Sequence, residues 1–323
     1  MRQEAYFCTV KELDELGKNN IPRQLISHTH LIYSSPATLA FNSPGAEGFG
    51  VKRAGLAVPD SVMLIVSPGC CGRNTSVLSS MRAYQDRFYY LLMDETDIVT
   101  GRHLKKIPKA VAEICEGLKK KPSVVMICIT CVDALLGTDM ERVCHKAEEY
   151  AGVPVRPCYM YALTREGRKP PMVHVRQSVY SLLEPKKKKG NVVNLLGYFS
   201  PLTDDCELYD LLHGAGVKTI HEISRCKDYA QYQTMSEANF NLVLHPEARF
   251  AAEDFHDRLK IPYIELRRLY QIDKIASQYR AFAAALGVEF EDEIPRKAAE
   301  EAVEKFRKIH PDAVFAVGEW MNG

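Results

Sequence analysis

Two turns in this chain place cysteines directly after apolar runs. Cys70 and Cys71 lie in the turn at residues 67–72, after the run 62–66, and Cys131 follows the run 124–129. Short apolar, β-branched runs are typical of buried strands, and parallel sheets present ligand sites at the carboxyl ends of their strands. Thiolates gathered there are the usual ligands of iron–sulfur clusters. The sequence therefore predicts a metallocluster site.

The other cysteines have a simpler explanation. The chain has 10 cysteines, and in a reducing cytosol these are not expected to form disulfides. Cys128 makes a CxxC with Cys131, but it falls within the apolar run, so we assign it to the core rather than to the cluster. The same assignment as small buried hydrophobes applies to Cys8, Cys115, Cys144 and Cys158.

Composition narrows the class of protein. A chain of 323 residues suits two α/β domains, and 46% apolar residues supply a sizeable core. A net charge of +1 gives no reason to expect a nucleic acid or an anionic membrane as partner. The sequence contains no apolar run of the ~20 residues that a membrane span needs, and no signal-peptide apolar region near the N-terminus. We expect a cytoplasmic protein.

Strand and helix patterns alternate along most of the chain. After an irregular first ~60 residues with one helix at 11–16, strands are expected at 62–66, 88–93, 124–129 and 153–157, with helices at 75–84, 104–119 and 139–150. A lysine-rich linker at 186–189 precedes a second set, with strands at 191–196, 217–220, 240–244 and 264–266 and helices at 206–213, 249–259 and 272–286. A helix at 296–309 and a strand at 313–318 open a further unit. Such alternation predicts tandem doubly wound parallel sheets.

We therefore expect an α/β fold with Rossmann-like domains at residues 1–187 and 188–292, and a truncated or missing third domain represented by 293–323. The loop carrying Asp94, Glu95 and Asp97 is expected to be solvated and to precede a helix.

Several motifs, in this order, resemble the nitrogenase component 1 superfamily. They are PGCCG at 68–72, ETDIVTG at 95–101, TCVDALLGTD at 130–139 and VNLLG at 193–197. Several spaced motifs are more specific than any single one. The superfamily includes the molybdenum–iron protein of nitrogenase, the dark-operative protochlorophyllide and chlorophyllide reductases and the reductase of F430 biosynthesis. The resemblance implies the same tandem fold and a cluster near a subunit interface.

Carried over residue by residue, the resemblance makes Cys71 and Cys131 cluster ligands, with Cys70 as a further ligand or a neighbouring thiol. Residues 36–50 lack the upstream cluster cysteine of the nitrogenase α-subunit. Pro246 stands where the cysteine that anchors the iron–molybdenum cofactor is expected. We therefore expect no iron–molybdenum cofactor and no reduction of dinitrogen.

The ligand count suggests a second subunit. Cys71 and Cys131 supply two thiolates, whereas a [4Fe–4S] cluster generally takes four. A homodimer with the cluster on its two-fold axis, or a paralogous component 1 subunit, would supply the others. With Cys70 included, three ligands per chain would support a larger bridging cluster.

Three further residues are weighed against plain structural roles. His245 is a candidate catalytic residue, as proton donor or substrate contact, or else a structural histidine at a strand end. Arg73 is a candidate neighbour that offsets the charge of the cluster, or a surface residue at a helix start. Cys226 is assigned to the surface or to the surroundings of the cleft rather than to metal ligation.

No GxxxxGK[ST] phosphate loop and no GxGxxG occurs in the sequence, so we expect no ATP bound by this chain and no nicotinamide chemistry. The leading prediction is the catalytic component of a nitrogenase-like reductase. It would take electrons from an ATP-dependent P-loop iron protein and reduce a small-molecule or tetrapyrrole substrate. The alternatives are a metallocluster scaffold or carrier without turnover, and a cluster-free α/β binding protein.

Overall fold

Two four-stranded parallel sheets organise the chain. The computed structural model describes residues 9–17, 19–20, 22, 44–69, 79, 81–159 and 169–313. The first sheet has the order β2 (Phe88–Leu92), β1 (Val62–Ser67), β3 (Val125–Ile129), β4 (Val155–Tyr159), and all its pairs are parallel. Every residue of the central strands β1 and β3 is buried, which explains their unbroken apolar sequences.

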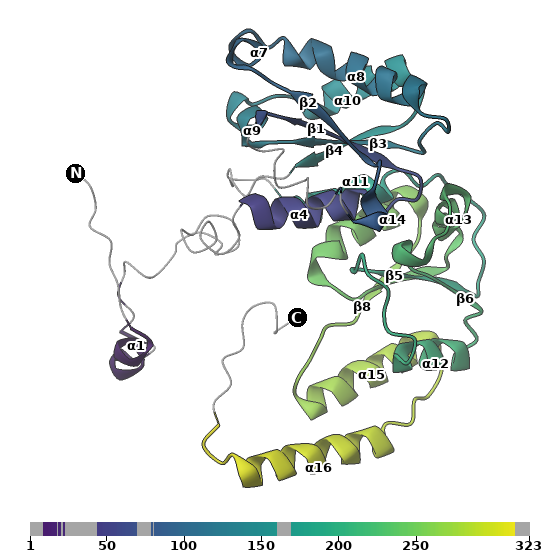
Figure 1. The fold of residues 1–323 in the computed structure, drawn as a ribbon. Coiled ribbons are helices and arrows are strands. Elements are labelled where there is room, and N and C mark those ends of the chain that lie inside the picture. The colour runs from purple at the N-terminus through teal and green to yellow at the C-terminus, as the bar shows by residue number, and fades with distance from the viewer. Residues whose placement is uncertain are drawn as a thin grey trace.

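Helices cover both faces of the first sheet. On the outer face lie α8 (His103–Gly117) and α10 (Met140–Ala151), whose buried residues recur at helical spacing. On the inner face lie α4 (Pro44–Gly55) and α11 (Pro171–Tyr180) (Figure 1). Two short helices, α7 (Glu95–Thr100) and α9 (Cys131–Leu136), follow the carboxyl ends of β2 and β3.

The second sheet repeats this topology. Its order is β6 (Thr219–His221), β5 (Val192–Leu196), β7 (Phe240–Val243), β8 (Tyr263–Glu265), again with every pair parallel. One face packs on α12 (Glu207–Gly214) and α15 (Ile272–Leu286), and the other on α14 (Arg249–Leu259). The connecting elements are η3 (Ile223–Arg225), α13 (Tyr229–Gln233), η4 (Thr234–Glu237) and η5 (Pro246–Ala248).

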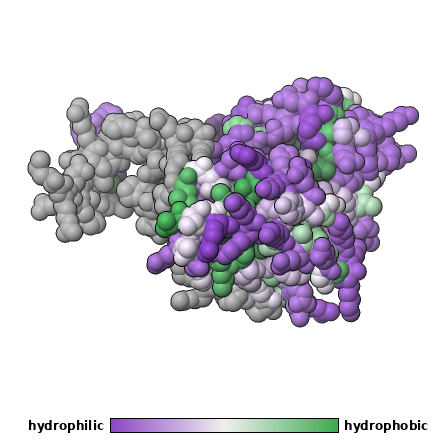
Figure 2. All heavy atoms as spheres, turned by 90° about the horizontal axis from the view of Figure 1, so that it is seen from above, coloured by the Kyte–Doolittle hydropathy of each residue, from purple (hydrophilic) through white to green (hydrophobic). Residues whose placement is uncertain are grey.

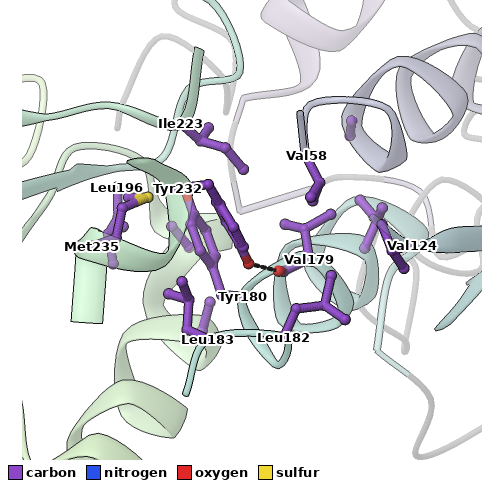
Figure 3. Close-up of a cluster of buried hydrophobic side chains, with 14 of the residues drawn as sticks. Val58, Val124, Val179, Tyr180, Leu182, Leu183, Leu196, Ile223, Tyr232 and Met235 are labelled. Carbon is purple, nitrogen blue, oxygen red and sulfur yellow. Dashed lines mark hydrogen bonds between the residues drawn. The ribbon is translucent and has the colours of Figure 1, made fainter. Parts of the chain in front are cut away.

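A shared hydrophobic core joins the two sheets. Residues of α4, α11 and α14 pack in one cluster with the inner faces of both sheets, which gives alternating layers of helices and sheets (Figure 1). Figure 3 shows the centre of this cluster, where the buried rings of Tyr180 and Tyr232 meet side chains from both halves of the chain. The Tyr232 hydroxyl donates to the Val179 carbonyl, so this bond pins α13 to α11.

The remaining described elements are α1 (Val10–Leu16), η2 (Arg82–Tyr84) and α16 (Glu293–Ile309). No residue of α16 is buried, and the helix lies against α15. Seen from above, the face formed by the outer helices is mainly hydrophilic, with smaller hydrophobic groups between (Figure 2). None of the helices in the described part of the chain combines the length and apolar composition needed to cross a bilayer.

The predicted fold class is confirmed, with all eight predicted strands of the two sheets present. The prediction that the first ~60 residues are irregular apart from one helix was wrong for residues 44–55, because α4 forms there. A Cβ on Gly55 would lie 2.8 Å from Met63 Cε and 2.9 Å from Cys158 Sγ, so glycine lets this helix lie close against the sheet. The helix α11 was also not predicted.

The lysine-rich linker is exposed in part but fastened to the second unit. Lys188 Nζ donates to the Ser236 carbonyl at 2.9 Å, and Lys189 forms an ion pair with Glu237. The domain boundaries at 187/188 and 292/293 stay predictions. The strand expected at 313–318 lies outside the described residues apart from Ala313. Of the helix expected at 75–84, half lies outside the described residues, and its last three residues form the short 3-10 helix η2.

Candidate functional site

The two cysteine turns follow the two strands at the switch point of the first sheet. From β1 the chain adds β2 on one side and then returns to add β3 on the other. The connections therefore diverge between β1 and β3, and the carboxyl ends of the strands at such a switch point are where open α/β sheets bind ligands. Cys131 is the first residue of α9, directly beyond this end of β3.

The predicted ligands fall largely outside what the structure describes. Cys70, Cys71 and Arg73 lie outside the described residues, as does the placement of the Cys131 side chain. Ser67 and Gly69 bring the chain from the end of β1 to the first two of these residues. Their assignment as ligands and neighbour therefore stays a prediction.

Two buried hydroxyl groups distinguish this edge of the sheet. Val66 is paired with Ile129, so the residues that follow, Ser67 and Thr130, are neighbours at the ends of β1 and β3. Ser67 is fully buried and Thr130 is 1% exposed, yet within the described part of the chain neither hydroxyl has a hydrogen-bond partner. An unpaired buried hydroxyl costs free energy. Such hydroxyls fit an anionic, sulfur-rich group, since each can donate to a thiolate or sulfide.

The second sheet has the equivalent switch point between β5 and β7. Gly197 follows β5 and His245 follows β7, so these two residues correspond in topology to the two cysteine turns. Gly197 has φ +137°, and a Cβ there would lie 2.8 Å from both the backbone nitrogen and the Cβ of His245. Only glycine permits this approach.

The environment of His245 decides which form its imidazole takes. Its Nδ1 accepts from the Glu247 backbone N–H at 3.3 Å, so Nε2 carries the proton of the neutral ring. Burial, together with Arg176 and then Arg268, lowers the pKa of His245 to about 4. At neutral pH the ring is therefore an uncharged hydrogen-bond donor. Of the two predicted functional roles, substrate contact fits this state better than proton donation.

Arg176 fixes the loops around His245. Its guanidinium, 5% exposed, donates to the Gly197 carbonyl at 2.7 Å, to the Met172 carbonyl at 2.9 Å and to Glu247 Oε2 at 2.7 Å. It also lies 4.9 Å from the ring centre of Phe199. Burial raises the pKa of Glu247, although Arg176 opposes this shift. One cation thus ties the ends of β5 and β7 to α11.

A second buried network lies beside the Cys131 turn. Asp97 is 2% exposed, which corrects the solvated loop expected at this position, and the hydrogen bond from Lys106 holds the pKa of its carboxyl below the usual range. His103 and Asp133 are also buried and lie 2.9 Å apart, from Nε2 to Oδ1. Their separation of 30 residues gave no local signal of the contact.

The non-ligand cysteines behave largely as predicted. Cys115, Cys128, Cys144 and Cys158 are buried free thiols, and burial raises the pKa of Cys128 to about 12. Cys226 is half-buried and its thiol donates to the Glu222 carbonyl at 3.4 Å. Cys8 lies outside the described residues.

Two parallel four-stranded sheets of the same topology, joined by a shared core, place this protein among the tandem doubly wound α/β proteins. Residues 47–314 match the sequence profile of the nitrogenase component 1 type oxidoreductases. This chain belongs to that family.

Individual curated proteins share about a quarter of the aligned residues with this chain. The chain is similar to the nitrogenase iron-molybdenum cofactor biosynthesis protein NifE of Nostoc sp., with 27% identity over 71% of this chain and 49% of the relative. It is 26% identical to NifE of Klebsiella pneumoniae, over 76% of this chain and 58% of the relative. With NifE of Methanococcus maripaludis it shares 24% identity over 85% of this chain and 57% of the relative. The chain thus spans about half the length of these curated relatives.

The fold is also found in a solved structure. The structure titled nitrogenase Cp1 at pH 6.5 superimposes with a TM-score of 0.56 at 18% identity, covering 82% of this chain and 61% of that one. At this level of identity the likeness concerns the fold.

Proposed function

We propose that this chain holds an iron–sulfur cluster at the carboxyl edge of its first sheet and carries it during metallocluster assembly. Cys71 and Cys131 are the proposed thiolate ligands, with Cys70 as a third ligand or neighbour and Arg73 beside them. The observation that carries the proposal is that β1 and β3, the strands after which the two cysteine turns follow in the sequence, are neighbours at the switch point of the first sheet. The buried, unpartnered hydroxyls of Ser67 and Thr130, judged over the described residues, support an anionic occupant.

The proposed cluster is of [4Fe–4S] type and is shared between subunits. Two thiolates per chain leave two of the four usual ligands to a second copy of this chain or a paralogous component 1 subunit. When bound, the cluster would supply one-electron redox chemistry. The chain's own residues would hold it, orient it and offset its charge. Pro246, which begins η5, offers no thiolate at the second switch point, so no iron–molybdenum cofactor is expected in the nitrogenase manner.

The carrier role is favoured over turnover by the names of the relatives, which are cofactor biosynthesis proteins. A second candidate is the catalytic component of a nitrogenase-like reductase, fed by a P-loop iron protein. The site around His245 favours it, because a neutral imidazole donor at the second switch point suits a small-molecule or tetrapyrrole substrate. In either role the location is proposed to be cytoplasmic.

One anaerobic experiment tests the cluster. The full chain is purified without oxygen, and iron, sulfide and the EPR spectrum of the reduced protein are measured. The proposal predicts about four irons per dimer. Cluster-free protein from wild type, or the same iron content in Cys131→Ser as in wild type, would overturn it.

A second experiment separates the two roles. Protein loaded with ⁵⁷Fe is mixed with a P-loop iron protein, ATP and dithionite, and the iron is followed by Mössbauer spectroscopy. A carrier loses its cluster or changes it once, in stoichiometric amount. A reductase returns to its starting spectrum after many electrons have passed.

A further inference from the structure

A series of buried hydrogen bonds links α7 to α9, the helix that begins with Cys131. His103, the first residue of α8, is fully buried, and Asp133 in α9 is 1% exposed. The His103 Nε2 lies 2.9 Å from Asp133 Oδ1, and its Nδ1 lies 3.1 Å from the Asp97 carbonyl oxygen. The imidazole therefore bridges α7 and α9.

The partners of His103 determine where the protons lie. A carbonyl oxygen can only accept, so Nδ1 must donate to Asp97. A neutral ring with its proton on Nδ1 would then turn a bare Nε2 lone pair toward the oxygen of Asp133. At 2.9 Å this arrangement requires one more proton between Nε2 and Oδ1. The contact is therefore either an imidazolium–carboxylate pair or a carboxylic acid donating to imidazole, and hydrogen bonds with an ionised member are the stronger kind.

Asp97 and Asp133, at the two ends of this hydrogen-bond series, each have further partners. Asp97 Oδ2 accepts from Lys106 Nζ at 2.7 Å, and Arg102 Nε lies 3.4 Å from Oδ1. Asp97, whose carbonyl accepts from His103, is therefore held to the first turn of α8 by its side chain. At the other end, Thr138 donates through its backbone N–H to the Asp133 carbonyl and through Oγ1 to Asp133 Oδ1, both at 3.0 Å. These two bonds close the turn that follows α9.

The position of Asp133 gives this network its consequence. α9 has only 6 residues and begins directly after β3, so its own backbone bonds fix its direction weakly. Asp133 lies two residues after Cys131, and its contact with His103 ties α9 to α8. Movement of Asp133 would therefore turn the first turn of α9, and Cys131 with it.

We propose that His103 is a positioning residue for Cys131, acting through Asp133 to hold the cysteine turn at the switch point. The role of Cys131 as a cluster ligand rests on the function proposed above. The positioning itself concerns the protein alone and can be tested without the cluster.

The experiment compares three variants of the full chain. Asp133→Leu keeps the approximate volume and removes every polar contact of the side chain. Asp133→Asn keeps hydrogen bonding, because its amide can donate to neutral Nε2. As a matched control, Asn241→Leu removes another fully buried side-chain bond, from Asn194 Nδ2 to Asn241 Oδ1 at 2.7 Å, in the second sheet.

The first readout is hydrogen exchange in the metal-free protein. We expect exchange in residues 131–138 to be at least tenfold faster in Asp133→Leu and within twofold of wild type in Asp133→Asn and Asn241→Leu. The second readout is the EPR spectrum and retained iron after anaerobic reconstitution. Asp133→Leu should shift the spectrum and lose at least half of the iron, whereas Asp133→Asn should match wild type.

Each outcome decides the matter. If Asp133→Leu exchanges in residues 131–138 like the Asn241→Leu control, or if Asp133→Asn fails as Asp133→Leu does, the positioning role is overturned. Wild type without iron would overturn the proposed function, and the exchange measurement would still test the positioning. If Asp133→Leu does not fold, His103→Asn replaces it, with exchange in the same segment and the same limits.

Discussion

Gly197 and His245 meet so closely at the second switch point that a Cβ on Gly197 would lie 2.8 Å from the backbone nitrogen of His245. The loops after β5 and β7 are therefore packed backbone against backbone. Arg176, donating to the Gly197 carbonyl, holds them from the side of α11. The close approach of these two loops requires a residue without a Cβ at position 197.

Gly197→Ala should destabilise the protein by on the order of 2–3 kcal/mol, since it combines backbone strain with a clash against fixed backbone atoms. Urea unfolding measures the change. Gly287→Ala is the matched control, because Gly287 also has a positive φ of +70° but would place its Cβ in open space. It should cost about 1 kcal/mol. Equal losses in the two variants would contradict the close approach.

Stability should fall as the pH is lowered from about 6.5 to 4, in part through His245. Its folded pKa of about 4 lies below the value of 6.5 for an unperturbed histidine, so in this window the unfolded chain binds a proton that the folded chain does not. The stability from the neutral ring is complete above this window and lost through it. Allowing for solvent around the ring, the contribution is on the order of 1–2 kcal/mol.

The variant that tests this dependence is His245→Gln, compared with wild type by urea unfolding at several pH values. Its curve should be flatter between pH 6.5 and 4. His145→Gln serves as control, because the side chain of His145 is 75% exposed. A His245→Gln curve with the wild-type slope would contradict the prediction.

Arg176→Met should cost about 3–5 kcal/mol, because it leaves the half-buried Glu247 carboxylate and two backbone carbonyls without their donor. The double variant Arg176→Met with Glu247→Leu should lose less than the sum of the two single variants, since it removes the unpaired carboxylate. A double-mutant cycle by urea unfolding measures this coupling. Additive losses would show that the pair acts independently.

Cys71→Ser and Cys131→Ser should each lower the bound iron to less than a tenth of wild type, because each removes a ligand from both halves of a shared cluster. Cys226→Ser should keep the wild-type iron content, since its thiol is used in a bond to the Glu222 carbonyl. Iron analysis together with circular dichroism measures ligand loss apart from loss of fold. Loss of iron in Cys226→Ser would require a different set of ligands.

Much of the fold could be read from local patterns. Strands such as β1 and β3 are buried on both faces, so their sequences are unbroken apolar runs, and α8 and α10 each show one buried stripe. The helix α4 could not be predicted in this way. Its sequence has three interior glycines, and it is stabilised by packing on α11 and the sheet rather than by its own propensity.

The sequence by itself determined the succession of strands and helices along the chain, the cysteines that follow strands and the family motifs. These depend on residue type and short-range spacing. Only the tertiary structure decided the partners of His103 and Arg176. His103 and Asp133 are 30 residues apart, and Arg176 and Glu247 are 71 apart. Such pairs form because buried polar groups must find partners wherever the packed elements bring them together, and no local pattern records that choice.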